Sequence, residues 1–103
     1  RLTHNDQKMF VILINYTKPI EGVNEVLASH RAYLDTQYAA GRLICSGRKA
    51  DLSGGVLISN AKTKEEVDEI IKNDPYNLKD VANYDVIEFT PGKFDEKFKP
   101  FID

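Results

Sequence analysis

A single histidine lies on the apolar face of a predicted amphipathic helix. The segment that carries it, residues 23–41, reads VNEVLASHRAYLDTQYAAG. At 3.6 residues per turn, His30 falls inside the stripe of apolar side chains Val23, Leu27, Leu34 and Tyr38, with Val26 at its edge. Histidine ionises near neutral pH, so its ring suits general acid–base chemistry. Two interpretations follow: a polar pocket between helix and sheet, or a core histidine satisfied by a backbone carbonyl.

A carboxylate at an abrupt helix end is the second candidate. Asp74 stands in the run NDPY, which ends at Tyr76. A carboxylate beside an imidazole fixes the tautomer of the ring, as in catalytic dyads. Asp-Pro is also a common turn former, so this run alone does not place Asp74 beside His30.

A Ser-Gly pair is the third candidate, at a point where a predicted strand dissolves. Gly47 allows a ligand to approach the backbone closely, and Ser46 offers a hydroxyl for one hydrogen bond. Arg31 and Arg48 could each hold an anionic ligand, although a solvated arginine is the commoner case. The pair at 54–55, Gly-Gly, predicts a hairpin turn.

Strands and helices that position these residues alternate along the chain. Apolar, β-branched runs predict strands at residues 10–16, 42–49, 55–61 and 84–90. Two helices are predicted, one from about residue 20 to residue 41 and one at residues 64–74. Thr63 and Glu66 form a capping box at the start of the second helix. The order βαββαβ is typical of the ferredoxin-like α+β fold, an antiparallel sheet with both helices on one face.

The predicted strands are apolar on both of their faces. In the first strand, Phe10, Ile12 and Ile14 alternate with Val11 and Leu13. Helices on one face leave the other face without a cover, and a second subunit is the simplest cover. We therefore expect a homodimer with its two sheets packed face to face.

Size and charge exclude several classes of protein. A net charge of −2, from 14 basic and 16 acidic residues, offers no broad basic surface for nucleic acid. The chain has no run of about 18 apolar residues that would predict a membrane span. The polar residues 1–8 do not resemble a secretory signal, and we interpret them as an N-terminal extension or an expression remnant before Met9. Residues 9–103 are then one domain with a C-terminal tail.

The cysteine count bears on compartment and cofactor. Cys45 is the only cysteine, so no internal disulfide can form, and a reducing cytoplasmic location is expected. We expect a packed thiol rather than a nucleophile at this position. The chain offers too few ligands for a Cys/His zinc site, and it carries no nucleotide-binding fingerprint or phosphate loop. No metal and no cofactor are therefore implied.

Taken together, the motifs resemble the YciI-like (YCII-related) family of small proteins. The resemblance rests on SHRAYLDTQYAAGRLICSG, then GGVLI, then NDPYNLKDVANYDVIEFTPGKF, and runs from about Met9 to Phe94. It implies a ferredoxin-like fold that dimerises into an α+β barrel, with an active site built from a helix-borne histidine and the aspartate of the Asp-Pro block. These match His30 and Asp74, and the Ser-Gly element is expected to line the same pocket. Many family members continue Ser-Gly with proline, whereas this chain has Arg48.

Two functions compete at this stage. The first is a cofactor-free enzyme in which His30 is the acid–base group and Asp74 orients it, acting on a small, possibly aromatic or oxygenated metabolite by elimination, isomerisation or hydrolysis. One characterised branch of the family resembles a dehydrochlorinase acting on a chlorinated hydroxyhydroquinone. The second is a non-catalytic dimeric module that binds a small molecule or serves as an accessory subunit. Substrate or ligand contacts are expected from the pocket residues Ser46, Gly47, Arg48 and Tyr76.

Overall fold

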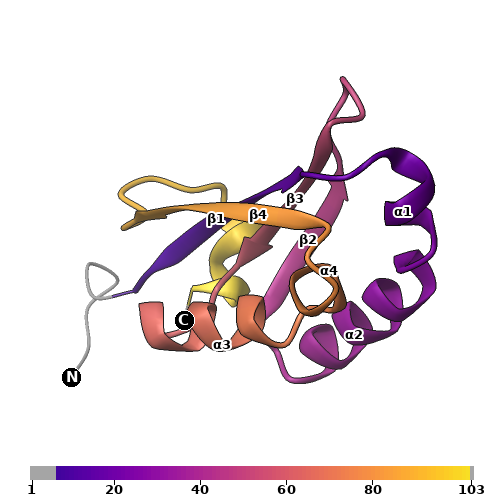
Figure 1. The fold of residues 1–103 in the computed structure, drawn as a ribbon. Helices are drawn as coiled ribbons and strands as arrows, with labels where there is room; N and C mark the ends of the chain where they lie inside the picture. Colours follow the sequence, from indigo (N-terminus) through magenta and orange to yellow (C-terminus); the bar gives the residue numbers. More distant parts are fainter. Residues whose placement is uncertain (1–6, 103) are drawn as a thin grey trace.

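Four antiparallel strands form one sheet with the helices on one face (Figure 1). The computed structural model describes residues 7–102, and the predicted extension lies outside them except for its last two residues. The strands are β1 (Met9–Tyr16), β2 (Leu43–Arg48), β3 (Gly54–Ser59) and β4 (Ala82–Phe89), in the spatial order β2-β3-β1-β4. The predicted βαββαβ order and the ferredoxin-like α+β class are confirmed.

Strand alternation decides which side chains form the core. Ile12 pairs with Leu57 of β3 and with Val86 of β4. Phe10, Ile12 and Ile14 are 0–2 % exposed, because the helices cover this face of β1. Burying a large apolar side chain contributes about 1.5–3 kcal/mol, so this row anchors the helices to the sheet.

The single helix predicted between residues 20 and 41 is two helices, α1 (Ile20–Asn24) and α2 (Leu27–Ala39). At the break, the Val26 amide donates to the carbonyl of Val23 at 2.9 Å. This bond spans three residues, as in a 3-10 turn, whereas the bonds within an α-helix span four. The break directs Val26 into the core at 8 % exposure, although the pattern placed it at the edge of the stripe. Further along α2, Gln37 is buried while Tyr38 is 37 % exposed, so the real apolar face is rotated from the predicted one.

The second predicted helix also ends earlier than expected. Its capping box is confirmed: Thr63 accepts from the Glu66 amide at 3.2 Å, and α3 spans Lys64–Lys72. The chain then starts the short helix α4 (Pro75–Leu78), and Asp74 is its N-cap. A proline at the first helical position is favourable because that position needs no amide donor.

Two predictions about glycines were wrong. Strand β2 continues through Gly47 to Arg48 instead of dissolving, with a register shift between Leu43 and Cys45. The pair at 54–55 lies inside β3, and a Cβ built on Gly54 would stand 1.7 Å from the Ile14 carbonyl oxygen. Gly54 is therefore required by close strand approach, not by a turn.

The sheet face opposite the helices is mostly apolar, although it also carries Asp85 and Asn15, which are hydrogen-bonded to each other. No second layer of helices or strands covers it among residues 7–102. Val11 lies between Ile58 and Ile87, and Leu13 lies opposite Val56. Ile87 is 51 % exposed and Phe89 of the same strand is 45 % exposed.

The thiol of Cys45, predicted to be packed, is exposed. No helix within these residues is long and apolar enough to cross a membrane.

The C-terminal tail ends in a short 3-10 helix, η2 (Glu96–Phe101). The rings of Phe98 and Phe101 lie 5.4 Å apart, and Ile102 is 2 % exposed. The side-chain amide of Asn60, at the end of β3, donates to the Phe101 carbonyl at 3.1 Å. These contacts attach the tail to the domain.

Candidate functional site

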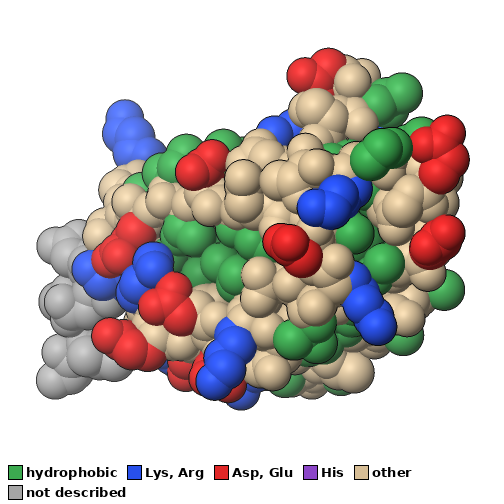
Figure 2. All heavy atoms as spheres, in the orientation of Figure 1, with side chains coloured by type: hydrophobic (Ala, Val, Ile, Leu, Met, Phe, Trp, Pro, Cys, Tyr) green, Lys and Arg blue, Asp and Glu red, His purple; other side chains and the backbone are tan. Residues whose placement is uncertain are grey.

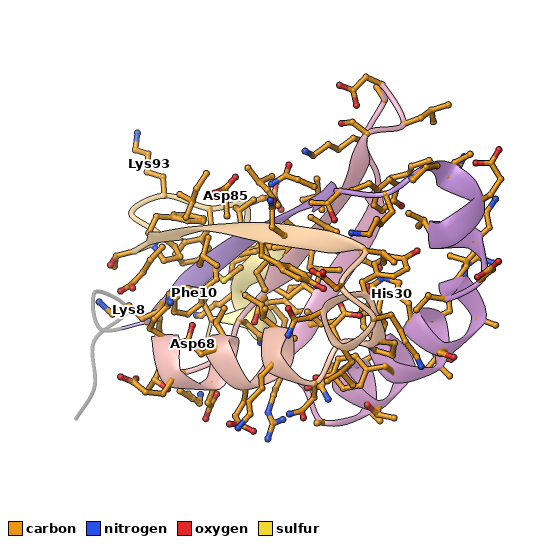
Figure 3. The ribbon with its side chains drawn as sticks, viewed as in Figure 1. Lys8, Phe10, His30, Asp68, Asp85 and Lys93 are labelled. Carbon is orange, nitrogen blue, oxygen red and sulfur yellow. The ribbon has the colours of Figure 1, made fainter. Side chains whose placement is uncertain are left out.

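His30 and Asp74 meet in the interior, where α2 approaches α4. Nδ1 of His30 lies 2.7 Å from Oδ1 of Asp74, and the two side chains are 8 % and 1 % exposed. Figure 3 places the His30 ring beside α4. Figure 2 shows no histidine on this face of the molecule, in keeping with that burial. The structure thus brings together two residues that are 44 positions apart in the sequence.

The Asp74 carboxylate has three hydrogen-bond partners. Oδ1 lies against Nδ1 of His30 and also accepts from the Tyr76 amide at 3.0 Å, the N-cap bond of α4. Oδ2 accepts from the Tyr84 hydroxyl at 2.8 Å. A buried carboxylate is costly unless its oxygens are hydrogen-bonded, and both oxygens are bonded here. Asp74 therefore caps a helix and orients an imidazole with the same oxygen.

Tyr84 was not identified from the sequence. It lies on β4, where its backbone pairs with Ile14, and its side chain packs against the core on the helix side of the sheet. Burial, followed by the nearby Asp74 charge, raises the pKa of the Tyr84 hydroxyl. The group therefore stays protonated and remains a donor to Asp74. The one sequence signal was its alternation with Val86, which puts both on the same face.

Aromatic rings hold the imidazole from the side. The ring of Tyr76 stacks on His30 with centroids 3.8 Å apart and planes 8° from parallel. Tyr16 meets Tyr76 edge to face at 5.8 Å. Burial raises the pKa of the Tyr76 hydroxyl, with Tyr16 as the next cause. Together, Asp74 fixes one edge of the His30 ring and Tyr76 fixes its plane.

A cavity of about 280 Å³ lies in front of this pair. Its walls come from α2, from the middle of the sheet and from the last residues of β2. The lining residues are Ile14, Tyr16, Leu27, His30, Arg31, Leu34, Ser46, Gly47, Arg48, Gly55, Leu57 and Tyr76. All the candidates singled out from the sequence are in this set except Asp74, which lies behind the ring of His30.

Ser46 is engaged across the cavity wall. Its Oγ lies 2.7 Å from the Tyr38 hydroxyl, and this contact connects β2 to α2. Gly47 leaves open space where a side chain would stand, because no atom lies within 4 Å of a Cβ built there. The Ser-Gly element therefore gives the cavity a wall that is part backbone and part hydroxyl.

The polar side chains at the cavity are of the kind that transfers protons. Within residues 7–102, no cluster of three or more histidine, cysteine or acidic side chains could hold a metal ion. Nδ1 of His30 faces a carboxylate, and the ring borders a cavity. An imidazole in this setting can take and return a proton at its other nitrogen, while the carboxylate stabilises the charged ring.

Comparison with known proteins gives a family match and structural matches. The family model of the YCII-related domain matches residues 9–90 of this chain. A 5-chloro-2-hydroxyhydroquinone dehydrochlorinase from Burkholderia phenoliruptrix AC1100, in complex with 2,5-dihydroxybenzoquinone, has a TM-score of 0.67 at 22% identity and covers 86% of this chain and 97% of its own. A conserved protein from Methanosarcina mazei Go1 has a TM-score of 0.56 at 14% identity, covering 84% and 94%. In sequence, no curated protein matches this chain.

Proposed function

The chain belongs to the YCII-related domain family, and on that premise we propose that it is a small enzyme that moves a proton with its His30–Asp74 pair. The reaction class is elimination, isomerisation or hydrolysis of a small oxygenated metabolite. The observation that carries the proposal is the 2.7 Å contact between Nδ1 of His30 and Oδ1 of Asp74, buried behind a cavity that the histidine lines.

The proposed mechanism assigns one role to each ring nitrogen. Nδ1–H donates to Asp74, which selects the tautomer with the lone pair on Nε2. Nε2 then removes a proton from a substrate in the cavity, and the positive charge that develops on His30 is stabilised by the Asp74 carboxylate. The proton is returned to the product or to the leaving group in the second half of the reaction.

Tyr84 and Tyr76 act through the pair and are positioning residues in this proposal. The Tyr84 hydroxyl satisfies Oδ2 of Asp74 and keeps the carboxylate from rotating away from His30. The stacked ring of Tyr76 holds the imidazole in plane. Proton transfer is sensitive to donor–acceptor geometry, so both contacts support the rate.

The cavity favours a single-ring substrate. Its volume of about 280 Å³ is just below the range of about 300–1,000 Å³ that is typical of pockets for drug-sized ligands. Tyr16 and Tyr76 are the aromatic residues of its lining besides His30, and Ser46 supplies a hydroxyl. The dehydrochlorinase that shares this fold was solved with 2,5-dihydroxybenzoquinone, a planar oxygenated ring of suitable size. A small oxygenated ring is therefore the proposed substrate class.

Two further parts of the proposal concern the setting of the enzyme. A second copy of the chain covers the apolar sheet face, on which Ile87 is 51 % exposed and Phe89 is 45 % exposed. The proposed location is the cytoplasm, which the free thiol of Cys45 supports.

Deuterium exchange tests the proposal without requiring the native substrate. Wild-type protein is mixed with 2,5-dihydroxybenzoquinone in D₂O, and loss of the ring C–H signal is followed by ¹H NMR. Exchange adds a deuteron to a ring carbon and removes the proton, which is the general acid–base step assigned to His30. The wild type should accelerate exchange, and His30→Gln should slow it roughly 100- to 10,000-fold.

The same experiment separates the enzyme from a binding module. If the ligand binds to the wild type and the exchange rate equals that of His30→Gln, the chain is a binding module and the enzyme proposal is wrong. A panel of hydroxyquinones, hydroquinones and small enols extends the test across the substrate class. Exchange that is absent from the whole panel would also contradict the proposal.

A further inference from the structure

Two arginines that line the cavity, one on α2 and one on β2, lack acidic partners among residues 7–102. Arg31 follows His30 on α2, and Arg48 is the last residue of β2. Both line the cavity, and no aspartate or glutamate is among its lining residues. Neither arginine makes an ion pair or a side-chain hydrogen bond to another of the residues 7–102. The cavity therefore presents two unneutralised guanidinium groups.

Neighbouring carboxylates do not neutralise them: Asp35, one helical turn after Arg31 on α2, makes no ion pair with it. Asp74 lies behind the His30 ring, and its oxygens are taken up by His30, the Tyr76 amide and Tyr84. The charge of Arg31 does act inward, because it lowers the pKa of the Tyr76 hydroxyl against the larger effect of burial. A positive potential thus reaches the wall on which His30 is stacked.

We propose that Arg31 and Arg48 make the cavity selective for an anionic substrate, a single oxygenated ring that carries a carboxylate or an ionised enol oxygen. This inference rests on the proposed function and specifies its substrate class. Guanidinium groups bind such oxygens through charge-assisted hydrogen bonds, often two at a time. Because the groups flank the cavity from α2 and β2, they fix the orientation of a bound ring relative to His30.

Three matched probes test the charge selectivity by calorimetric titration. Gentisate and hydroquinone share a ring and differ by one carboxylate, and 2,5-dihydroxybenzoquinone carries ionised enol oxygens instead. The anionic probes should bind to the wild type at least about tenfold more tightly than hydroquinone. Arg31→Met and Arg48→Met should each weaken anion binding about fivefold, since exposed ion pairs are individually weak. The double variant should bind all three probes alike.

A control variant separates local charge from net charge. Lys93 lies far from His30 in Figure 3, so Lys93→Met removes one positive charge without altering the cavity. It should leave the anion preference unchanged. Raising the ionic strength should weaken anion binding to the wild type and should have no effect on hydroquinone.

The outcomes distinguish this inference from the proposed function. Charge selectivity is measured in the His30→Gln background as well, where binding should persist although exchange is lost. Selectivity without any His30-dependent exchange would refute the enzyme and keep the anionic ligand class. Equal affinity of the wild type for all three probes, a preference for anions that survives in the double variant, or no binding of either anion to the wild type at millimolar concentration would overturn the inference.

Discussion

The hydroxyl of Tyr84 donates a 2.8 Å hydrogen bond to Oδ2 of Asp74, and Oδ1 of the same carboxylate lies 2.7 Å from Nδ1 of His30. A residue of the sheet thereby holds a carboxylate that belongs to a helix cap, and that carboxylate holds an imidazole on another helix. The contact joins β4, α4 and α2 at one buried point. Substitution of any one of these three residues should therefore change the hydrogen bonding of the other two.

Tyr84→Phe removes one bond and keeps the ring. The carboxylate then has an unsatisfied oxygen in the interior, which should cost about 1–3 kcal/mol of unfolding free energy. The exchange rate should also fall, because Asp74 is freer to leave His30. Tyr33→Phe is the matched control: its hydroxyl donates to the Ile70 carbonyl at 2.8 Å and not to Asp74. Urea titration and exchange kinetics on both variants check this, and equal loss of exchange in both would contradict it.

Asp74→Asn separates the helix cap from the charge. Asparagine caps helices about as well as aspartate, so α4 should persist. The amide cannot stabilise a positively charged imidazole as a carboxylate does, and exchange should fall by about a hundredfold or more. Asp95 caps η2 by accepting from the Lys97 amide at 2.9 Å, and it is not among the residues that line the cavity. Asp95→Asn should leave exchange unchanged, and an Asp74→Asn variant as active as this control would remove Asp74 from the mechanism.

Alkaline pH should destabilise the fold through its buried tyrosines. Burial raises the pKa of Tyr84 and of Tyr76 above the ordinary value of 10.0. A raised pKa means that the folded state retains protons that the unfolded chain releases. The stability from these groups is complete below about pH 10 and is lost as the pH rises above it. Urea midpoints measured between about pH 9 and pH 11.5 should fall more steeply for the wild type than for Tyr84→Phe, and parallel curves would refute the assignment.

Gly54→Ala tests the close approach of two strands. A Cβ at this position would collide with the Ile14 carbonyl oxygen at 1.7 Å, so the variant should lose about 3 kcal/mol or more. Gly47→Ala meets no atom within 4 Å and lies in the neighbouring strand. It should keep wild-type stability in the same denaturant titration. Two variants of equal stability would show that β1 and β3 can separate to admit the methyl group.

Leu13→Asp tests the second subunit. Leu13 lies on the uncovered sheet face opposite Val56, whereas Ile12 and Ile14 face the helices. A second carboxylate beside Asp85, which pairs with Leu13 on this face, should convert a dimer to a monomer at micromolar concentration. Ala28→Asp, at an exposed position of α2, is the control and should remain dimeric. Sedimentation velocity gives both answers, and a wild type that sediments as a monomer would rule out the homodimer.

The sequence was sufficient for the features that depend on local chemistry. The spacing of Thr63 and Glu66 predicted the capping box. The alternation in β1 predicted that Ile12 and Leu13 lie on opposite faces of the sheet. The order of elements followed, and with it the ferredoxin-like fold. Local patterns also marked His30 as an ionisable ring on an apolar face, which the structure buries at 6 % exposure.

What the sequence could not predict depends on contacts between distant segments. The bond from Tyr84 to Asp74 needs β4 and α4 to be docked, and no pattern within β4 encodes its partner. Gly54 was assigned to a turn because its constraint comes from the carbonyl of Ile14, 40 positions earlier in the chain. The break before α2 likewise goes with a contact that the local pattern does not contain, the packing of Val26 against the core. Tertiary packing decided each of these.

Nitrogen NMR of the His30 ring tests the central claim most directly. The claim is that Nδ1–H of His30 donates to Asp74 and that Nε2 of the same ring contacts the ligand. The chain has two histidines, so ¹⁵N-histidine labelling of a His4→Gln variant leaves one ring to observe. In the neutral ring, the long-range ¹H–¹⁵N spectrum should show the proton on Nδ1, and 2,5-dihydroxybenzoquinone should shift the Nε2 signal far more than the Nδ1 signal. A proton on Nε2, or two nitrogen signals that a bound ligand leaves unmoved, would contradict the account.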